Sequence, residues 1–245
     1  MRPIRLFTDS PLEPGHSLGL PAWAAAHALR VLRLKPGDAV TLFNGDGHEY
    51  PARLAAVGAR EVQAEVMARE SPARESPLRV TLIQALARGE KMDWIVQKGT
   101  ELGAARIIPV TTERSEVKLD AARGEKRLEH WRGVAIAACE QCGRNVMPVI
   151  EAPLELSAWL EATRDERDSR WMLHPDGTTR ARDLRATAST TLDLAVGPEG
   201  GFGDIDLAVL RAHGFRELAI GPRILRTETA GVAAIAALQA LYGDL

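Results

Sequence analysis

Two glycine-bearing segments carry residue types that could bind a small polar ligand. Gly197-Pro198-Glu199-Gly200-Gly201 would leave backbone N–H and C=O groups open to a ligand that approaches closely. Residues 221–229 (Gly-Pro-Arg-Ile-Leu-Arg-Thr-Glu-Thr) place arginines beside Thr227, a candidate helix N-cap, where an anion could bind. A tight turn, or a capped helix with a surface ion pair, would also explain either segment alone. The segment 197–201 does not match a dinucleotide fingerprint or a P-loop, which disfavours a dehydrogenase or an NTPase.

A third segment could contact phosphate groups. His27, Arg30 and Arg33 bring one imidazole and two guanidinium groups within two turns of a predicted helix. A solvated helix face is the alternative interpretation. Residues 143–145 (Gly-Arg-Asn) end another predicted helix and could contact a substrate or cap that helix.

The two cysteines do not predict a metal or redox site. Cys139 and Cys142 are spaced like half of a zinc site, but the chain has no second cysteine pair to complete four ligands. A redox-active pair is expected at the start of a helix, whereas this pair closes one. We therefore expect no metal.

Charge and composition limit the class of protein. The 31 lysine and arginine residues nearly balance 33 acidic residues, which argues against a globally basic nucleic-acid-binding protein. However, 26 of the basic residues are arginines, whose planar fork suits phosphates and stacking. Two cysteines and the lack of a signal peptide or a long apolar run predict a cytoplasmic protein without a membrane span.

The elements that must position these residues fall into two regions. The first is β-rich, with strands expected at 38–43, 50–57 and 61–67 and a short helix at 21–32. A polar, proline-containing linker covers 69–77. Beyond it, strands are expected at 78–85, 106–110, 171–173, 192–196 and 217–220, and helices at 90–102, 121–142, 204–212 and 227–241.

Alternation of strands and helices predicts an α/β domain with a mainly parallel sheet. Ligands bind at the carboxyl ends of the strands in such sheets. Both glycine-bearing segments follow predicted strands directly, as does Leu173-His174-Pro175. We therefore expect these three strand ends to form the site.

Several further stretches accompany the segments described above: Arg88-Gly-Glu-Lys91, Gln97-Lys98, Glu101-Leu-Gly103, Glu113-Arg-Ser115 and 137–145. Together with 197–201 and 221–229, they resemble the RsmE family, the bacterial 16S ribosomal RNA uridine-N3 methyltransferases of the SPOUT superfamily. The likeness spans nearly the whole chain, and the motifs at 197–201 and 221–229 are specific in combination.

The resemblance implies a small N-terminal PUA-like β-barrel domain over residues 1–72 and a trefoil-knotted SPOUT α/β domain over 73–245. It also implies S-adenosylmethionine (SAM) as cofactor, a homodimer, and methylation of the uridine conventionally numbered 1498 within the 30S subunit. Residues expected to bind the cofactor are Leu173, His174, Gly197, Pro198, Gly200, Gly201, Ile220, Gly221, Leu225, Arg226 and Thr227. Residues expected to contact RNA are Arg5, His27, Arg30, Arg33, Arg88, Lys91, Arg144, Asn145 and Arg223.

Methyl transfer to uracil N3 requires loss of the N3 proton and stabilisation of charge. We assign the cationic role to Arg226 and proton acceptance to Glu228 or Glu199, either of which could instead be structural. Two alternatives stay open: a SPOUT methyltransferase acting on another RNA position, and a non-catalytic RNA-binding ribosome-assembly protein. One departure from the family lies at 202–206 (Phe-Gly-Asp-Ile-Asp), where relatives often carry Ser or Thr, so helix capping there is less certain.

Overall fold

The computed structural model describes residues 4–57, 61–117, 120–163, 169–184 and 190–245. The chain divides into two compact units. The first comprises the chain up to Glu75 and a returning segment, Cys139–Met147; the second comprises Ser76–Ala138 and Pro148–Leu245. The sequence-based boundary at residue 72 did not include this return.

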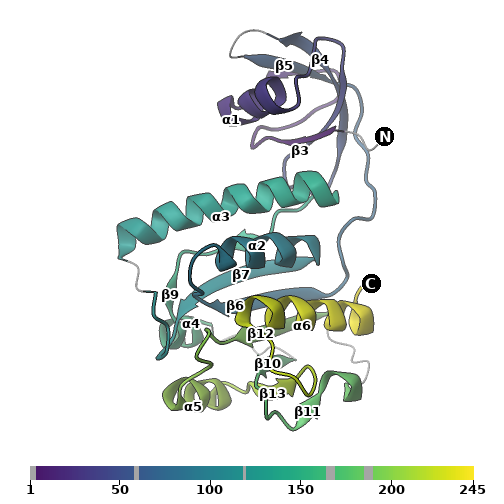
Figure 1. The fold of residues 1–245 in the computed structure, drawn as a ribbon. Coiled ribbons are helices and arrows are strands. Elements are labelled where there is room, and N and C mark those ends of the chain that lie inside the picture. The colour runs from purple at the N-terminus through teal and green to yellow at the C-terminus, as the bar shows by residue number, and fades with distance from the viewer. Residues whose placement is uncertain (1–3, 58–60, 118–119, 164–168, 185–189) are drawn as a thin grey trace. The chain divides into compact units, whose positions relative to one another are not determined.

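The first unit contains a five-stranded sheet and one short helical segment (Figure 1). Strands β1 and β3 are parallel, and the other pairs are antiparallel. The strands lie in the order β1-β3-β4-β5-β2, and their bounds are Ile4–Phe7 (β1), Ser17–Gly19 (β2), Ala39–Phe43 (β3), Tyr50–Val57 (β4) and Val62–Val66 (β5). The helical segment is α1 (Ala22–Ala26) followed at once by the π-helical turn η1 (His27–Val31).

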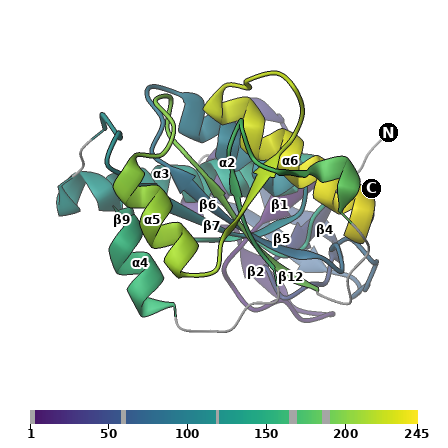
Figure 2. The same ribbon diagram turned by 90° about the horizontal axis from the view of Figure 1, so that it is seen from below.

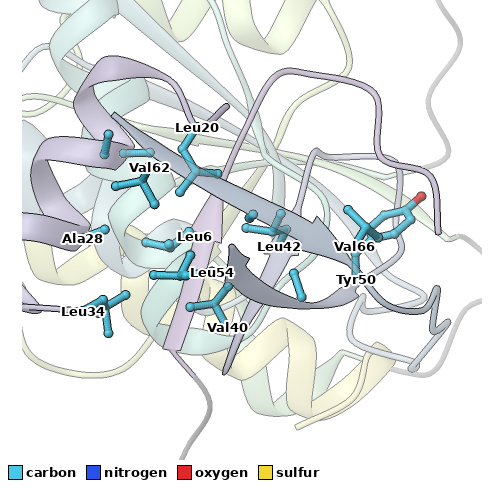
Figure 3. Close-up of a cluster of buried hydrophobic side chains, with 14 of the residues drawn as sticks. Leu6, Leu20, Ala28, Leu34, Val40, Leu42, Tyr50, Leu54, Val62 and Val66 are labelled. Atoms are coloured by element: carbon cyan, nitrogen blue, oxygen red, sulfur yellow. The ribbon is translucent and has the colours of Figure 1, made fainter. Parts of the chain in front are cut away.

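One hydrophobic cluster joins the sheet and the helical segment of the first unit (Figure 3). Leu6, Leu42 and Leu54 supply it from three strands, and Ala28 and Leu34 supply it from the helical side. All five side chains are buried. The alternating burial of β5, which is buried at every second residue, is the pattern of a strand with one face on a core.

The second unit is built on a parallel sheet in the order β11-β13-β10-β12-β6-β7-β8, with β9 also paired to β7. β6 and β12 are buried over nearly their whole length, as expected for central strands covered on both faces. The bounds are Arg79–Ala85 (β6), Ala104–Thr111 (β7), Val149–Ile150 (β8), Leu154–Glu155 (β9), Arg170–Leu173 (β10), Thr179–Arg180 (β11), Thr191–Val196 (β12) and Arg216–Ala219 (β13).

Helices cover both faces of this sheet (Figure 2). α4 (Leu156–Ala162) and α5 (Asp204–Ala212) pack on one face through a shared apolar cluster. On the other face, glycines 99 and 231 bring α2 (Lys91–Glu101) and α6 (Thr227–Tyr242) against Leu82. α3 (Ala121–Cys142) is joined to α2 by a 3.1 Å hydrogen bond from Trp131 Nε1 to Asp93 Oδ1.

The strands and helices predicted from the sequence are confirmed within one or two residues, apart from the helix at 21–32. That helix changes from α to π at His27 and ends at Val31. Prediction missed β1, β2, β8, β9 and β11, which are short, and also α4 and the 3₁₀ turn η2 (Ala181–Asp183). Among the described residues, no helix is long and apolar enough to cross a membrane.

Candidate active site

The carboxyl ends of β10, β12 and β13 surround one cleft of about 610 Å³. A cleft of this size lies within the range of ~300–1,000 Å³ for small-molecule sites. All but one of the residues predicted to bind a cofactor line it. The exception is Gly221, whose carbonyl oxygen accepts a 3.3 Å hydrogen bond from Arg180 Nη1. The sheet therefore brings three separated sequence segments to one place.

The glycines of the β12 loop allow the loop to fold tightly on itself. A Cβ atom at Gly197 would lie 3.0 Å from the backbone nitrogen of Phe202, so a side chain has no room there. Gly201 has a φ of +70°, in the left-handed region that favours glycine. The loop therefore presents backbone polar groups instead of side chains over part of the cleft wall.

The loops after β12 and β13 are joined by Thr227. Its hydroxyl donates a 2.6 Å hydrogen bond to the Gly197 carbonyl and accepts a 3.0 Å bond from Gln84 Nε2. The prediction that Thr227 caps helix α6 was wrong, because Arg226 occupies the N-cap position and provides no side-chain cap. The Thr227 hydroxyl is instead committed to bonds outside its own helix.

Lys91 joins the two glutamates predicted to act in catalysis. Its Nζ lies 2.8 Å from Glu199 Oε1 and 3.7 Å from Glu228 Oε2. The backbone N–H of Arg88 donates a further 3.1 Å bond to Glu199. Lys91 and Glu199 line the cleft, and Glu228 stands beside it in the first turn of α6.

The two glutamates differ in their surroundings. Burial raises the pKa of Glu199, but the hydrogen bonds from Lys91 and Arg88 outweigh burial and bring this pKa below its ordinary value of 4.5. Glu199 is therefore an anion and a weak base. Glu228 Oε2 is buried and has no hydrogen-bond partner among the described residues. The ion pair of this oxygen with Lys91 Nζ, at 3.7 Å, is longer than the 2.8 Å contact of Glu199, so Glu228 is held less closely than Glu199.

Some arginines at or near the cleft have guanidinium groups paired with other residues, and some do not. Arg226 and Arg223 are exposed and line the cleft, and their guanidinium groups form no hydrogen bond or ion pair within the part of the chain that the structure describes. Arg114 Nη1 instead donates a 3.2 Å bond to the Gly200 carbonyl, and Arg88 is paired with Glu116. Arg226 and Arg223 are thus the guanidinium groups available to a ligand here.

Comparison with known proteins assigns the chain to a family. A family model described as an RNA methyltransferase domain matches residues 74–239, and one described as an RNA methyltransferase PUA domain matches residues 24–67. The chain is 31% identical over 218 residues to ribosomal RNA small subunit methyltransferase E of Buchnera aphidicola, covering 89% of this chain and 85% of that protein. It is 30% identical over 249 residues to the Bacillus subtilis enzyme, covering 97% and 96%. The chain belongs to the ribosomal RNA small subunit methyltransferase E (RsmE) family.

Solved structures agree with this assignment. A methyltransferase from Legionella pneumophila, solved with bound SAM, superposes with a TM-score of 0.94 at 38% identity over 100% of both chains. An RsmE from Neisseria gonorrhoeae bound to SAM gives 0.91 at 36% identity, again over 100% of both chains. The expected fold class is confirmed: a PUA-like domain precedes a SPOUT methyltransferase domain.

Three of the residues predicted to contact RNA are buried within the first unit of this RsmE-family chain. Arg5 is 8% exposed and donates to Glu49 Oε2 at 2.8 Å and to Asn145 Oδ1 at 2.6 Å. Arg144 pairs with Glu75 at 2.8 Å, and Glu75 also accepts the Asn145 backbone N–H. These contacts fasten residues 139–147 to the N-terminal segment, so we leave Arg5, Arg144 and Asn145 out of the proposed RNA surface.

Helix capping at 202–206, which the sequence left less certain, is provided by carboxylates. The space that a Gly203 side chain would occupy holds the Glu113 carboxylate, which accepts the Ile205 backbone N–H at 3.2 Å. Asp206 accepts the Gly203 N–H at 3.0 Å and the Glu113 N–H at 3.2 Å. Helix α5 is therefore capped by carboxylates, one of which comes from the end of β7.

Sequence reasoning gave no role to Gln84, Glu113 or Arg114. Glu113 and Arg114 follow β7, so the rule used for the other strand ends would have found them. Gln84 lies within a buried strand and carries no local signal. Neither cysteine is among the residues that line this cleft. Burial raises the pKa of Cys139 to about 12, so its thiol is protonated at neutral pH.

Proposed function

We propose that this chain transfers a methyl group from SAM to N3 of a specific uridine, conventionally numbered 1498, in 16S rRNA of the 30S subunit. The observation that carries the proposal is the single cleft at the ends of β10, β12 and β13. The chain has the fold of two relatives whose structures were solved with SAM. The names of the RsmE relatives support ribosomal RNA of the small subunit as the substrate.

The residues of the cleft fit SAM. Leu173, Ile220 and Leu225 offer apolar contact, and the glycine-rich loop of residues 197–201 offers backbone donors and acceptors. A nucleoside with an amino-acid tail needs both kinds of contact. When bound, SAM would supply an electrophilic methyl group. His174, Pro198 and Thr227 complete the proposed cofactor site.

The protein must then align uracil N3 and remove its proton. We assign proton acceptance to Glu228, because its Oε2 has no hydrogen-bond donor among the described residues, whereas Lys91 holds Glu199 as a weak base. The Arg226 guanidinium has no partner among the described residues, lies at the cleft and would stabilise the negative charge that develops on the uracil oxygens. Lys91 would hold Glu199 as an anion and leave proton acceptance to Glu228.

RNA recognition is assigned to basic side chains in each unit. Arg88, Lys91 and Arg223 lie at or beside the cleft, and His27, Arg30 and Arg33 lie on the helical segment of the first unit. A homodimer in the cytoplasm, where 30S subunits assemble, completes the proposal. Ile224, which is 82% exposed at the cleft, is a candidate contact for the second copy.

Incubation with labelled SAM and under-methylated 30S subunits, followed by nucleoside analysis, tests the proposal. We expect 3-methyluridine at one position in 16S rRNA. SAM binding without 3-methyluridine would refute the assignment. Naked 16S RNA and tRNA run in parallel separate the two alternatives: methylation of either in preference to 30S subunits indicates another SPOUT substrate, and RNA binding without any transfer indicates an assembly protein.

A further inference from the structure

The helical segment from Trp23 to Arg33 in the first unit combines an exposed aromatic ring with exposed cations. We propose that this segment binds an unpaired nucleotide of the RNA substrate, with Trp23 stacking on the base and with Arg30 and Arg33 contacting the flanking phosphates. The inference rests on the proposed function for the identity of the RNA. It adds a base-stacking subsite that is separate from the methyl-transfer cleft of the second unit.

The charge around this segment favours an anionic partner. No acidic residue occurs between Glu13 and Asp38, although basic and acidic residues balance over the first 72 positions. Arg30, Arg33 and Lys35 fall within this acid-free stretch and are exposed. The acidic residues of the unit are thus placed elsewhere in its sequence, and positive charge is concentrated on one segment.

The Trp23 ring is supported by another aromatic ring and is partly open to solvent. It remains 45% exposed while its ring stacks on Phe7, with centroids 6.1 Å apart and planes 24° apart. Phe7 in turn meets Phe43 edge-on at 5.4 Å, and its backbone N–H is bonded to Glu140 at 3.0 Å. A ring supported on one side and open to solvent elsewhere can stack on a base with little loss of side-chain freedom.

The backbone keeps the cations of this segment outside the core. Ala28 and Leu34 lie in the hydrophobic cluster (Figure 3), which fixes the inner side of the segment. Trp23 and His27 are four residues apart and share a helix face. The π-helical turn is closed by a 3.1 Å bond from the Leu32 N–H to the His27 carbonyl, and Arg30 within this turn is exposed. π-helical turns are frequent at functional sites.

Arg33 occupies a backbone conformation that glycine would adopt more easily. Its φ is +54°, and it is the one residue other than glycine with positive φ among those that the structure describes. A left-handed residue often ends a helix, and glycine is favoured there. An arginine at this position costs backbone strain, so its side chain must contribute something that glycine cannot. A phosphate contact accounts for that choice.

Four full-length variants test the proposal. Trp23→Leu removes the stacking ring, and Trp23→Phe keeps a smaller one. Arg33→Gly removes the cation and relieves the backbone, and Arg33→Lys keeps the charge. Trp94→Leu is the matched control, because Trp94 is also part-exposed (40%) but lies on α2 in the second unit. Binding is measured by anisotropy at low salt with a fluorescein-labelled uridine oligonucleotide and with a matched duplex, and 30S methylation is measured separately.

We expect Trp23→Leu to weaken binding of the single strand about tenfold, Trp23→Phe to weaken it less, and Trp94→Leu to leave it unchanged. Arg33→Gly should keep or raise the midpoint of thermal unfolding. It should also flatten the slope of log affinity against log salt by about 0.7, the value for one phosphate contact on a single strand. Arg33→Lys should retain most of the wild-type slope. For 30S subunits, KM should rise in Trp23→Leu and Arg33→Gly while kcat and SAM affinity stay unchanged.

Equal loss of single-strand and duplex binding in Trp23→Leu would overturn the stacking role. A raised KM for 30S subunits with unchanged oligonucleotide binding would also overturn it, because the segment would then contact a ribosomal protein. Unchanged affinity and salt slope in Arg33→Gly would overturn the phosphate contact. A wild-type chain that binds RNA through Trp23 yet transfers no methyl group would refute the proposed function and leave this inference standing.

Discussion

The Thr227 hydroxyl donates a 2.6 Å hydrogen bond to the Gly197 carbonyl oxygen. This bond links the first residue of α6 to the loop that follows β12. Gln84 Nε2 donates to the same hydroxyl and to its own neighbour's carbonyl, both at 3.0 Å. Gln84 is fully buried and Thr227 is nearly so. Hydrogen bonds from Gln84, a buried residue of β6, through the Thr227 hydroxyl to Gly197 therefore connect the two loops that form walls of the cleft.

Thr227→Val should disturb both walls while keeping the branched shape of the side chain. The substitution leaves the Gln84 amide and the Gly197 carbonyl without their partner, and each buried unsatisfied group costs about 1–3 kcal/mol. We expect a lower unfolding midpoint and about tenfold weaker SAM binding in a calorimetric titration. Thr227→Ser keeps the hydroxyl and should bind nearly as wild type. Wild-type affinity in Thr227→Val would show that other contacts position the loops.

Arg226→Ala should abolish methyl transfer and leave the oligomeric state unchanged. Arg226 is exposed at the cleft and makes no ion pair with the described residues, so its loss removes a charge without breaking a structural contact. Labelled-methyl transfer to 30S subunits and light scattering measure the two effects. Arg223→Ala is the matched control for loss of one nearby guanidinium, and should raise the KM for 30S subunits more than it lowers kcat. Unchanged transfer in Arg226→Ala would remove the catalytic role.

Glu228→Gln and Glu199→Gln should separate the two candidate proton acceptors. A general base contributes about 10²–10⁴-fold, so Glu228→Gln should lower kcat by at least a hundredfold with SAM affinity retained. Glu199→Gln should lower kcat far less, because the Glu199 carboxylate is already engaged by Lys91. Single-turnover rates across pH measure both effects. A larger loss in Glu199→Gln would exchange the two roles.

Local sequence patterns were sufficient to predict the strands and helices that carry the cleft. The run at 192–196 and the glycines after it indicated a buried strand and a close-packed loop, and Gly197 has no room for a Cβ atom. Helix 121–142 was predicted to the residue because its apolar spacing is continuous. Signals of this kind lie within one element and need no knowledge of its partners.

Pairings between distant segments were outside the reach of such patterns. Arg5 and Asn145 are 140 positions apart in the sequence but form a buried hydrogen-bonded pair in the structure. Nothing in the local sequence distinguishes them from an exposed arginine and an exposed amide, so both were predicted to contact RNA. Thr227 has the residue type of an N-cap, but it is the first residue inside α6, and its hydroxyl donates to the Gly197 carbonyl instead. The expectation of a trefoil knot likewise rested on family resemblance alone, because threading leaves no trace in composition.

The Lys91–Glu199 ion pair should stabilise the protein above acidic pH and lose this effect in acid. The folded-state pKa of Glu199 lies below its ordinary value of 4.5, so the contribution is complete above that value and disappears as pH falls through the folded pKa. Because both side chains are about one-third exposed, the pair contributes about 0.2–1 kcal/mol. Unfolding midpoints of wild type and Glu199→Gln between about pH 3 and pH 7 should converge at the acidic end. A constant difference would show that the charge of Glu199 is not involved.

Gly203 and Glu113 should show strong coupling in a double-mutant cycle. Gly203→Ser alone forces its side chain into the space of the Glu113 carboxylate and should lower stability, although serine is a good N-cap residue. Glu113→Ala alone removes the acceptor of the Ile205 N–H and should cost about 0.5–2 kcal/mol, the usual effect of losing a cap.

The double variant places a serine where the carboxylate was, so the serine hydroxyl can cap α5 in its place. Its stability should therefore exceed the sum of the two single changes by more than ~0.5 kcal/mol, the limit within which independent sites add. Denaturant unfolding of the four chains measures the coupling, and Asp206→Asn tests the remaining carboxylate separately. Additive losses would show that Glu113 and Gly203 do not share one capping site.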